Sequence, residues 1–270
     1  MGDRASWLRA FADRRSPAEP DLDALELERL HPDAVIAARL VWRRRVVNER
    51  LSVDLARRLR LTAPEPELDL ALARLEADEQ RHVFLTQEVL ARLGASEPEA
   101  TPDLTVDEPH PVAYFRLVLT GLALSETVSA ARFAVVREHT DLDTFRACID
   151  AFFRDELAHS ELGFVLLPSA LEQLVMAIGK DRADALALDE LRSAFAHLDE
   201  VVGLDLERRG GPPPARPQPP DNPGVIEPAL DALAFYRAVH EELVPRLERA
   251  GLPAERAWRQ RCAPPLLPGR

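Results

Sequence analysis

Three Glu-x-x-His pairs are the residues of this sequence whose types and spacing best suit chemistry. The pairs are Glu28/His31, Glu79/His82 and Glu156/His159. A carboxylate and an imidazole three residues apart lie on one face of a helix, where both can bind one metal ion. With 25 Glu and 7 His in 270 residues, composition alone gives roughly 0.65 such pairs by chance. A single pair is therefore a weak motif, and the assignment depends on whether two pairs belong to one site.

Two of the three pairs have a further glutamate thirty residues upstream. Glu49 precedes Glu79 by 30 residues and Glu126 precedes Glu156 by 30, whereas no glutamate lies at that distance before Glu28. We therefore interpret Glu28/His31 as accidental.

The midpoints of these two intervals fall on helix-breaking sequence. Pro64 of "TAPEP" is midway between Glu49 and Glu79, and Asp141 of "HTDLD" is midway between Glu126 and Glu156. Residues equidistant from the turn of an antiparallel helical hairpin lie at the same height, here about 22 Å from the turn. Each hairpin is thus expected to present two carboxylates and one imidazole at one level.

The elements that must position these residues are helices. Tracts of Ala, Leu, Arg and Glu dominate, and patterns typical of strands are nearly absent. We expect a short helix near 21–30 and four long ones at about 33–61, 66–93, 111–138 and 143–167, with Pro168 ending or kinking the last. Further helices are expected over 169–179, 184–207 and 227–250, with a loosely ordered tail from 251.

The predicted organisation is an all-α, four-helix bundle of two helical hairpins joined by a long crossover, with additional N- and C-terminal helices. The polar segment 95–111 is much longer than a turn between antiparallel neighbours, as a crossover requires. The expected division is an N-terminal arm with a short helix (1–31), the bundle (32–180), an additional helix (181–207), a Pro/Gly-rich linker (208–224), and a C-terminal helix and tail (225–270).

Composition limits the class of protein. A net charge of −12 argues against nonspecific binding to nucleic acid or to an anionic membrane. The two cysteines, Cys148 and Cys262, are too few for a disulfide framework or a Cys-x-x-Cys metal site, and Cys148 is expected in the core. We find no secretory leader and no run approaching about 20 apolar residues, and we expect a cytoplasmic, bacterial protein.

Apolar residues at helical spacing share the face of the two upstream acids. They are Trp42, Val46, Val53 and Ala56 around Glu49, and Leu119, Leu122, Ala123, Ala130 and Phe133 around Glu126. Burying acids in such a stripe is costly, and four carboxylates at one height repel one another unless cations lie between them. Two divalent metal ions would neutralise them.

Four helices that contribute Glu, Glu-x-x-His, Glu and Glu-x-x-His resemble the ferritin-like superfamily of dinuclear carboxylate proteins. The resemblance covers about residues 33–167. Within this superfamily, the motifs of the chain are similar to those of bacterial ferritin-like domain proteins without an assigned substrate. It implies six metal ligands: Glu49, Glu79, His82, Glu126, Glu156 and His159. Glu79 and Glu156 would bridge the two ions, and each other ligand would bind one ion. Asp78 and Asp155, next to the bridging acids, would each hold a metal-bound histidine from behind; the alternative is that both face solvent.

By this resemblance the cofactor is a pair of Fe ions, or Mn/Fe or Mn/Mn. The first hypothesis is an oxidoreductase that uses O₂ or peroxide on a small apolar substrate, with a reductase as electron donor and a homodimer as the assembly. The second is a ferroxidase or iron-handling protein without an organic substrate. The third is a non-catalytic bundle stabilised by metal.

Other residues have simpler interpretations. The run "WRRRVV" (42–47) is expected to be a charged flank of its helix, with binding of an anionic partner as the alternative. His139 is expected to cap a helix C-terminus. Glu76 and Glu161 are expected to be solvated.

Overall fold

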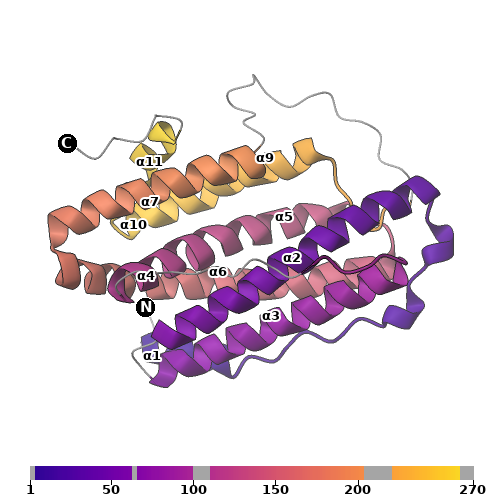
Figure 1. The fold of residues 1–270 in the computed structure, drawn as a ribbon, viewed down its shortest axis with the longest axis horizontal. Coiled ribbons are helices and arrows are strands. Elements are labelled where there is room, and N and C mark those ends of the chain that lie inside the picture. The colour runs from indigo at the N-terminus through magenta and orange to yellow at the C-terminus, as the bar shows by residue number, and fades with distance from the viewer. Residues whose placement is uncertain (1–3, 63–65, 100–109, 204–220, 262–270) are drawn as a thin grey trace.

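The computed structural model describes residues 4–62, 66–99, 110–203 and 221–261, and all secondary structure in these ranges is helical. The predicted all-α class is therefore confirmed. Figure 1 shows long helices running side by side, with the N-terminal helix α1 at one end of the α2–α3 pair.

Two antiparallel helical pairs form the centre of the molecule. The first pair is α2 (Pro32–Thr62) and α3 (Pro66–Arg92). The second begins with one helix over His110–Glu138, made of α4 (His110–Arg116), a π-helical segment η3 (Leu117–Glu126) and α5 (Thr127–Glu138), and continues with α6 (Asp143–Ile178). These bounds agree with the predicted helices, except that α6 continues past its predicted end.

The signals that delimit the first pair are local. Pro32 begins α2, a position where its missing N–H costs nothing. Gly94 follows α3 with φ +70°, a conformation that glycine adopts without a steric penalty.

The connection between the two pairs runs back along α2 in its described part. Arg50 of α2 donates to the carbonyl of Pro98 at 3.3 Å and also binds Glu97. In Figure 1, α3 ends at the opposite end of the bundle from the start of α4. This arrangement is what a crossover requires; most of the predicted connection lies outside the described residues.

Pro168 was predicted to end or kink this helix, and it does not end it, because α6 continues to Ile178. A proline inside a helix costs about 3 kcal/mol because it removes a hydrogen bond and clashes with the preceding turn. Leu166, Leu167 and Leu174 flank it and are fully buried, and each contributes about 1.5–3 kcal/mol. Tertiary packing therefore outweighs the local penalty, and the helix predicted over 169–179 is the last part of α6.

Helix α7 (Lys180–Val201) follows the turn at Gly179. It begins four residues before the predicted start at 184. With α9 (Pro228–Ala238), the π-helical segment η4 (Val239–Leu243) and α10 (Val244–Arg249), it forms a further layer alongside α5 (Figure 1). The helix predicted over 227–250 is therefore confirmed in position.

Three elements differ from the sequence prediction. Helix α1 (Arg4–Ala12) was not predicted and packs against α3. Two 3₁₀ turns, η1 (Leu22–Ala24) and η2 (Leu27–Arg29), replace the short helix expected at 21–30. Helix α11 (Ala254–Gln260) lies in the tail that was expected to be loosely ordered, where Trp258 packs against Phe195 and Phe235.

The linker predicted at 208–224 lies mostly outside the described residues. Its last four residues, 221–224, contact the bundle: the backbone N–H of Asn222 donates to the Asp141 carboxylate at 3.0 Å. The Trp42 indole and the Arg45 guanidinium approach the carbonyls of Pro223 and Gly224.

The core consists of two apolar clusters along the bundle. One contains Leu59, Leu72 and Leu166, and the other contains Trp42, Leu85 and Phe152. On α2, α3 and α6 the residues between the two clusters include buried charged side chains. A polar layer therefore lies at mid-height, closed by apolar packing at both ends. Cys148 lies in the second cluster, as predicted.

Two helices of the described chain, His110–Glu138 and Asp143–Ile178, are long and apolar enough to cross a membrane by length and composition. Charged residues interrupt both helices, so this finding does not contradict the expectation that no run approaches about 20 apolar residues. Core helices of water-soluble proteins meet the same criterion, and these two pack on each other and carry buried acids. Cytoplasmic location stays a prediction.

Candidate metal centre

The polar layer brings together the six residues that the sequence analysis selected. Four are glutamates and two are histidines, and none is more than 5% exposed: Glu49, Glu79, His82, Glu126, Glu156 and His159. They form two overlapping groups, in each of which one ligand atom per residue lies within 4.8 Å of all the others. Glu49 and His82 belong to one group only, Glu126 and His159 to the other, and Glu79 and Glu156 to both. The expectation that the acids of each hairpin share one height agrees with this geometry.

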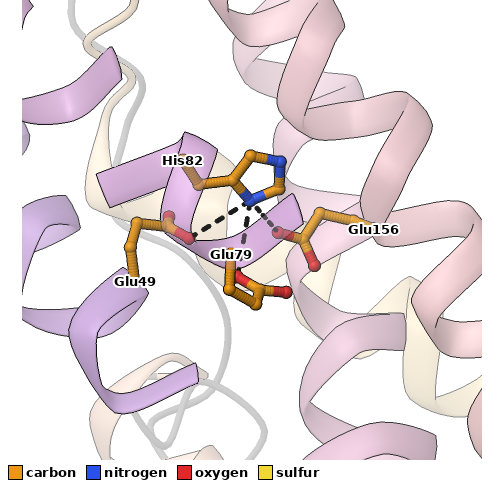
Figure 2. Close-up of side chains that lie close together, drawn as sticks. All are labelled: Glu49, Glu79, His82 and Glu156. Carbon is orange, nitrogen blue, oxygen red and sulfur yellow. Dashed lines mark ion pairs between the residues drawn. The ribbon is translucent and has the colours of Figure 1, made fainter. Parts of the chain in front are cut away.

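His82 supplies one nitrogen to the first group (Figure 2). Its Nδ1 lies 3.4 Å from Glu49 Oε2, 3.4 Å from Glu79 Oε2 and 3.8 Å from Glu156 Oε1. The other ring nitrogen, Nε2, points away from these three carboxylates (Figure 2). The ring is fixed by an edge-on contact with Phe152, at 4.8 Å between ring centroids.

His159 supplies the corresponding nitrogen to the second group. Its Nδ1 lies 2.8 Å from Glu79 Oε1 and 4.0 Å from Glu156 Oε2. Both imidazoles thus direct the same nitrogen towards the two shared glutamates, one from each hairpin.

Each histidine is backed by an aspartate of the opposite hairpin. His82 Nε2 lies 3.1 Å from Asp155 Oδ2, and His159 Nε2 lies 3.5 Å from Asp78 Oδ2, which is long for a hydrogen bond. Because a carboxylate only accepts, Asp155 keeps the proton of His82 on Nε2 and leaves the Nδ1 lone pair free to bind a cation. Both aspartates are buried, so the alternative that they face solvent is wrong.

Three arginines neutralise this pair of aspartates. Arg14 donates to Asp78 Oδ2 at 2.6 Å and lies 3.0 Å from Asp155 Oδ1. Arg74 binds Asp78 at 2.7 Å, and Arg81 binds Asp155. The sequence analysis missed all three. The sequence could have indicated Arg81, because it directly precedes His82 on the helix that carries Asp78. Nothing in the local sequence indicates Arg14, which reaches the aspartates only because α1 packs against α3.

Glu126 is the last residue of the π-helical segment, a second feature that the sequence analysis missed. π-Helical turns often mark functional sites because the extra residue changes which side chains face inward. Gly163 of α6 permits the close approach of this segment, since a Cβ at that position would lie 2.6 Å from the backbone nitrogen of Ala123. Across the same contact, the Thr127 and Ser160 hydroxyls are 2.6 Å apart.

Burial and mutual repulsion perturb the carboxyl groups of the cluster. Burial raises the pKa of Glu126 from 4.5 to about 7. Burial, followed by the charge of Glu126, raises the pKa of Glu156 well above its usual value, and burial also raises that of Glu49. Burial acts in the same direction on Glu79, but the nearby charges of His159 and His82 outweigh it and lower that pKa.

For the two histidines burial acts in the opposite direction, but the pKa of each is nevertheless raised. Burial acts to lower the pKa of His159, but the nearby carboxylates of Glu79 and Asp78 outweigh it and raise the pKa to about 9. For His82 the carboxylates of Glu49 and Glu79, each 3.4 Å from Nδ1, likewise outweigh burial and raise the pKa. Without a cation, the cluster therefore reduces its negative charge by holding protons.

The donor atoms fit two metal ions. Several buried atoms that face the shared space lack a hydrogen-bond partner among the described residues: both carboxylate oxygens of Glu79, one of Glu156, and Nδ1 of each histidine. Buried polar atoms without partners are rare and call for a ligand. The four negative charges of the carboxylates, with both imidazoles neutral, would equal the charge of two divalent cations, and carboxylate with imidazole suits Fe and Mn.

The residues set aside by the sequence analysis lie outside the cluster. Glu28 and His31 are exposed, as is Glu161. Glu76 is half-buried and pairs with Arg57 and Arg60 instead of being fully solvated. His139 ends α5, where its Nδ1 lies 2.9 Å from the carbonyl of Val135, in agreement with the predicted cap.

Comparison of the chain with models of known protein families, with curated proteins and with solved structures found no match. The functional assignment therefore rests on the geometry of the site.

Proposed function

We propose that the chain is a ferritin-like four-helix bundle that binds two metal ions, Fe/Fe or alternatively Mn/Fe or Mn/Mn, and acts as an oxidoreductase with O₂ or peroxide. The observation that carries the proposal is the pair of overlapping ligand groups that share Glu79 and Glu156. Glu49 and His82 would complete one metal position, and Glu126 and His159 the other. Two such ions can each change oxidation state, so that the pair supplies two electrons to an oxidant.

The surrounding residues suit such a centre. Asp155 accepts from Nε2 of His82 and fixes the proton on that far nitrogen, which makes the near nitrogen a better ligand, and Asp78 lies behind His159 in the corresponding position. Arg14, Arg74 and Arg81 form ion pairs with the two buried aspartates and offset the cost of burying them. The apolar clusters above and below the layer exclude water and hold the four helices at fixed distances.

A cavity beside the cluster favours an organic substrate over iron handling alone. It has a volume of about 480 Å³, and both Glu49 and Glu156 contribute to its wall. Pockets of ~300–1,000 Å³ are usual for small organic ligands. A protein that only oxidises or stores iron has no need for a space of this size next to its metal ligands.

Anaerobic loading with Fe(II), followed by admission of O₂, tests the proposal. Wild-type protein should bind about two Fe(II) per chain and respond to O₂ by a change in absorption. E79A and E156A should each lose the metal pair, whereas the exposed control E28A should retain it, because only the first two residues belong to both ligand groups.

The amount of iron retained separates the candidate functions. Saturation near two atoms per chain after repeated additions of Fe(II) and O₂ supports catalysis, whereas many retained atoms indicate iron storage. Two bound metals that give no response to O₂ or peroxide indicate a non-catalytic, metal-stabilised bundle. A folded protein that binds no Fe(II) contradicts the proposal.

A further inference from the structure

The cavity next to the cluster has a mixed wall. It lies between α2, α5 and the segment that leads into α9, and its apolar lining includes Leu40, Val41, Phe133, Val136 and Ile226. Polar and charged side chains line it as well, including Arg45 on α2. The substrate expected from the sequence was small and apolar, and a buried cation in the wall changes that expectation.

Arg45 is an unusual cation because it is only 8% exposed. Its guanidinium lies over the Trp42 ring at 4.5 Å and near the Phe133 ring at 5.6 Å. One nitrogen, Nη2, donates to the carbonyl of Gly224 at 3.2 Å, while Nη1 is buried without a hydrogen-bond partner among the described residues. The sequence analysis expected the run that contains Arg45 to be a charged flank; Arg43 and Arg44 are exposed, but Arg45 faces the core.

No carboxylate of the described chain pairs with Arg45, and the two nearest acids are held elsewhere. Asp231 accepts two hydrogen bonds from Arg132, at 2.6 and 2.7 Å. Glu49 faces His82 in the metal cluster. A buried guanidinium without an anion is costly, since its desolvation is only partly compensated by aromatic rings and one carbonyl. Burial accordingly lowers the pKa of Arg45 to about 10.

The position of Arg45 sets the size of a ligand that would bind both it and the cluster. Arg45 and Glu49 are one helical turn apart on α2, a rise of about 6 Å. Glu49 and Glu156 mark the part of the cavity wall that belongs to the cluster. An anion at Arg45 therefore leaves room for a short carbon chain to extend along the apolar wall to the cluster.

We propose that this cavity binds an organic carboxylate, with Arg45 holding the carboxylate and the apolar wall holding the carbon chain. A guanidinium and a carboxylate form strong, two-point hydrogen bonds when both are shielded from water. Of the three arginines that line the cavity, Arg132 is already neutralised by Asp231 and Arg44 is exposed, so Arg45 alone is left to balance a buried anion. A singly charged group therefore fits better than a phosphate monoester. That this ligand is the substrate rests on the proposed function; that it binds does not.

Calorimetric titration of the metal-free protein in the presence of a chelator tests binding apart from the metals. The probes are octanoate, octan-1-ol, octylammonium and octyl phosphate, which share one carbon chain. Octanoate should bind at least about tenfold more tightly than each of the others. Equal affinities for octanoate and octan-1-ol would overturn the proposal, and so would tighter binding of octyl phosphate.

Variants of α2 test the role of Arg45 itself. R45M should weaken octanoate binding at least about tenfold, whereas R43M, which changes an exposed arginine of the same helix outside the cavity wall, should not. R45K keeps the charge and should retain binding if R45M fails to fold. Equal binding by wild type, R43M and R45M would refute the role of Arg45. Octanoate that binds only to the metal-loaded protein, with the same affinity in R45M, would also refute it.

The outcome is independent of the metal proposal. Failure to bind Fe(II) leaves the chelator titration unchanged, and failure of octanoate to bind leaves metal loading unchanged.

Discussion

Replacing Glu126 by glutamine should stabilise the metal-free protein at alkaline pH. In the folded chain burial raises the pKa of Glu126 to about 7, against 4.5 for the exposed group. The free energy of unfolding that depends on protonation of Glu126 is therefore fully present below pH 4.5. It is lost as the pH rises from 4.5 to about 7, because the folded state resists ionisation of this group. At pH 8 the loss is on the order of 3 kcal/mol. Glutamine has the same shape and does not ionise.

We expect E126Q to gain on the order of 3 kcal/mol at pH 8 and less than about 1 kcal/mol at pH 4.5. For a chain of this size the gain at pH 8 corresponds to a rise in Tm of roughly 6–12 °C. Urea denaturation followed by far-ultraviolet circular dichroism, with a chelator present, measures the difference. E28Q, which changes an exposed glutamate, is the control.

Bound metal should make wild type more stable than E126Q at pH 8. Divalent cations favour ionised Glu126, so wild type should be stabilised by added Fe(II) or Mn(II) under anaerobic conditions, and E126Q much less. A variant that is no more stable than wild type at pH 8, or that gains equally at both pH values, would show that Glu126 is not a strained acid in the cluster.

Three further predictions concern the support of the site. G163A should cost about 1–3 kcal/mol of stability and lower metal affinity, because its Cβ would lie 2.6 Å from the Ala123 nitrogen and displace the segment that carries Glu126; equilibrium unfolding and metal titration measure both effects. D155N removes the carboxylate behind His82 and should weaken metal binding roughly 10–100-fold in competition with a chelator. Metal affinity should rise between pH 6 and pH 8, since binding displaces protons from Glu126, whose pKa is raised to about 7, and from the histidines; calorimetry in buffers of different ionisation enthalpy should show proton release.

For each of these three predictions, one outcome would contradict the proposed role of the residue. A G163A variant with wild-type metal affinity would mean that the close helix contact does not position Glu126. For D155N the matched control is D54N, which changes a half-exposed acid of α2; equal affinities for the two variants would remove Asp155 from the site. Metal affinity that falls between pH 6 and pH 8 would contradict the assignment of the ligands.

The chemistry-bearing residues were predictable because their spacing repeats. Glu49 and Glu126 each precede a Glu-x-x-His pair by the same interval, and the turns lie at the midpoints. Hairpin geometry then places these residues at one level without any knowledge of side-chain contacts. Proline and glycine at the ends of α2 and α3 gave helix limits close to those observed.

The parts that were not predictable depend on tertiary contacts. Pro168 is a local signal for a helix end, but buried leucines on both sides override it. The π-helical segment that ends at Glu126 packs closely on Gly163 of another helix, a contact that no local pattern in the sequence predicts. Arg14 reaches Asp78 only because α1 packs on α3, and no spacing in the sequence connects them.

Anomalous diffraction from crystals grown after anaerobic loading with Mn(II) or Fe(II) tests the central claim most directly. The account predicts two peaks per chain, with Glu79 and Glu156 contacting both, Glu49 and His82 contacting one, and Glu126 and His159 contacting the other. A single peak, no peak, or metals bound away from these six residues would contradict it.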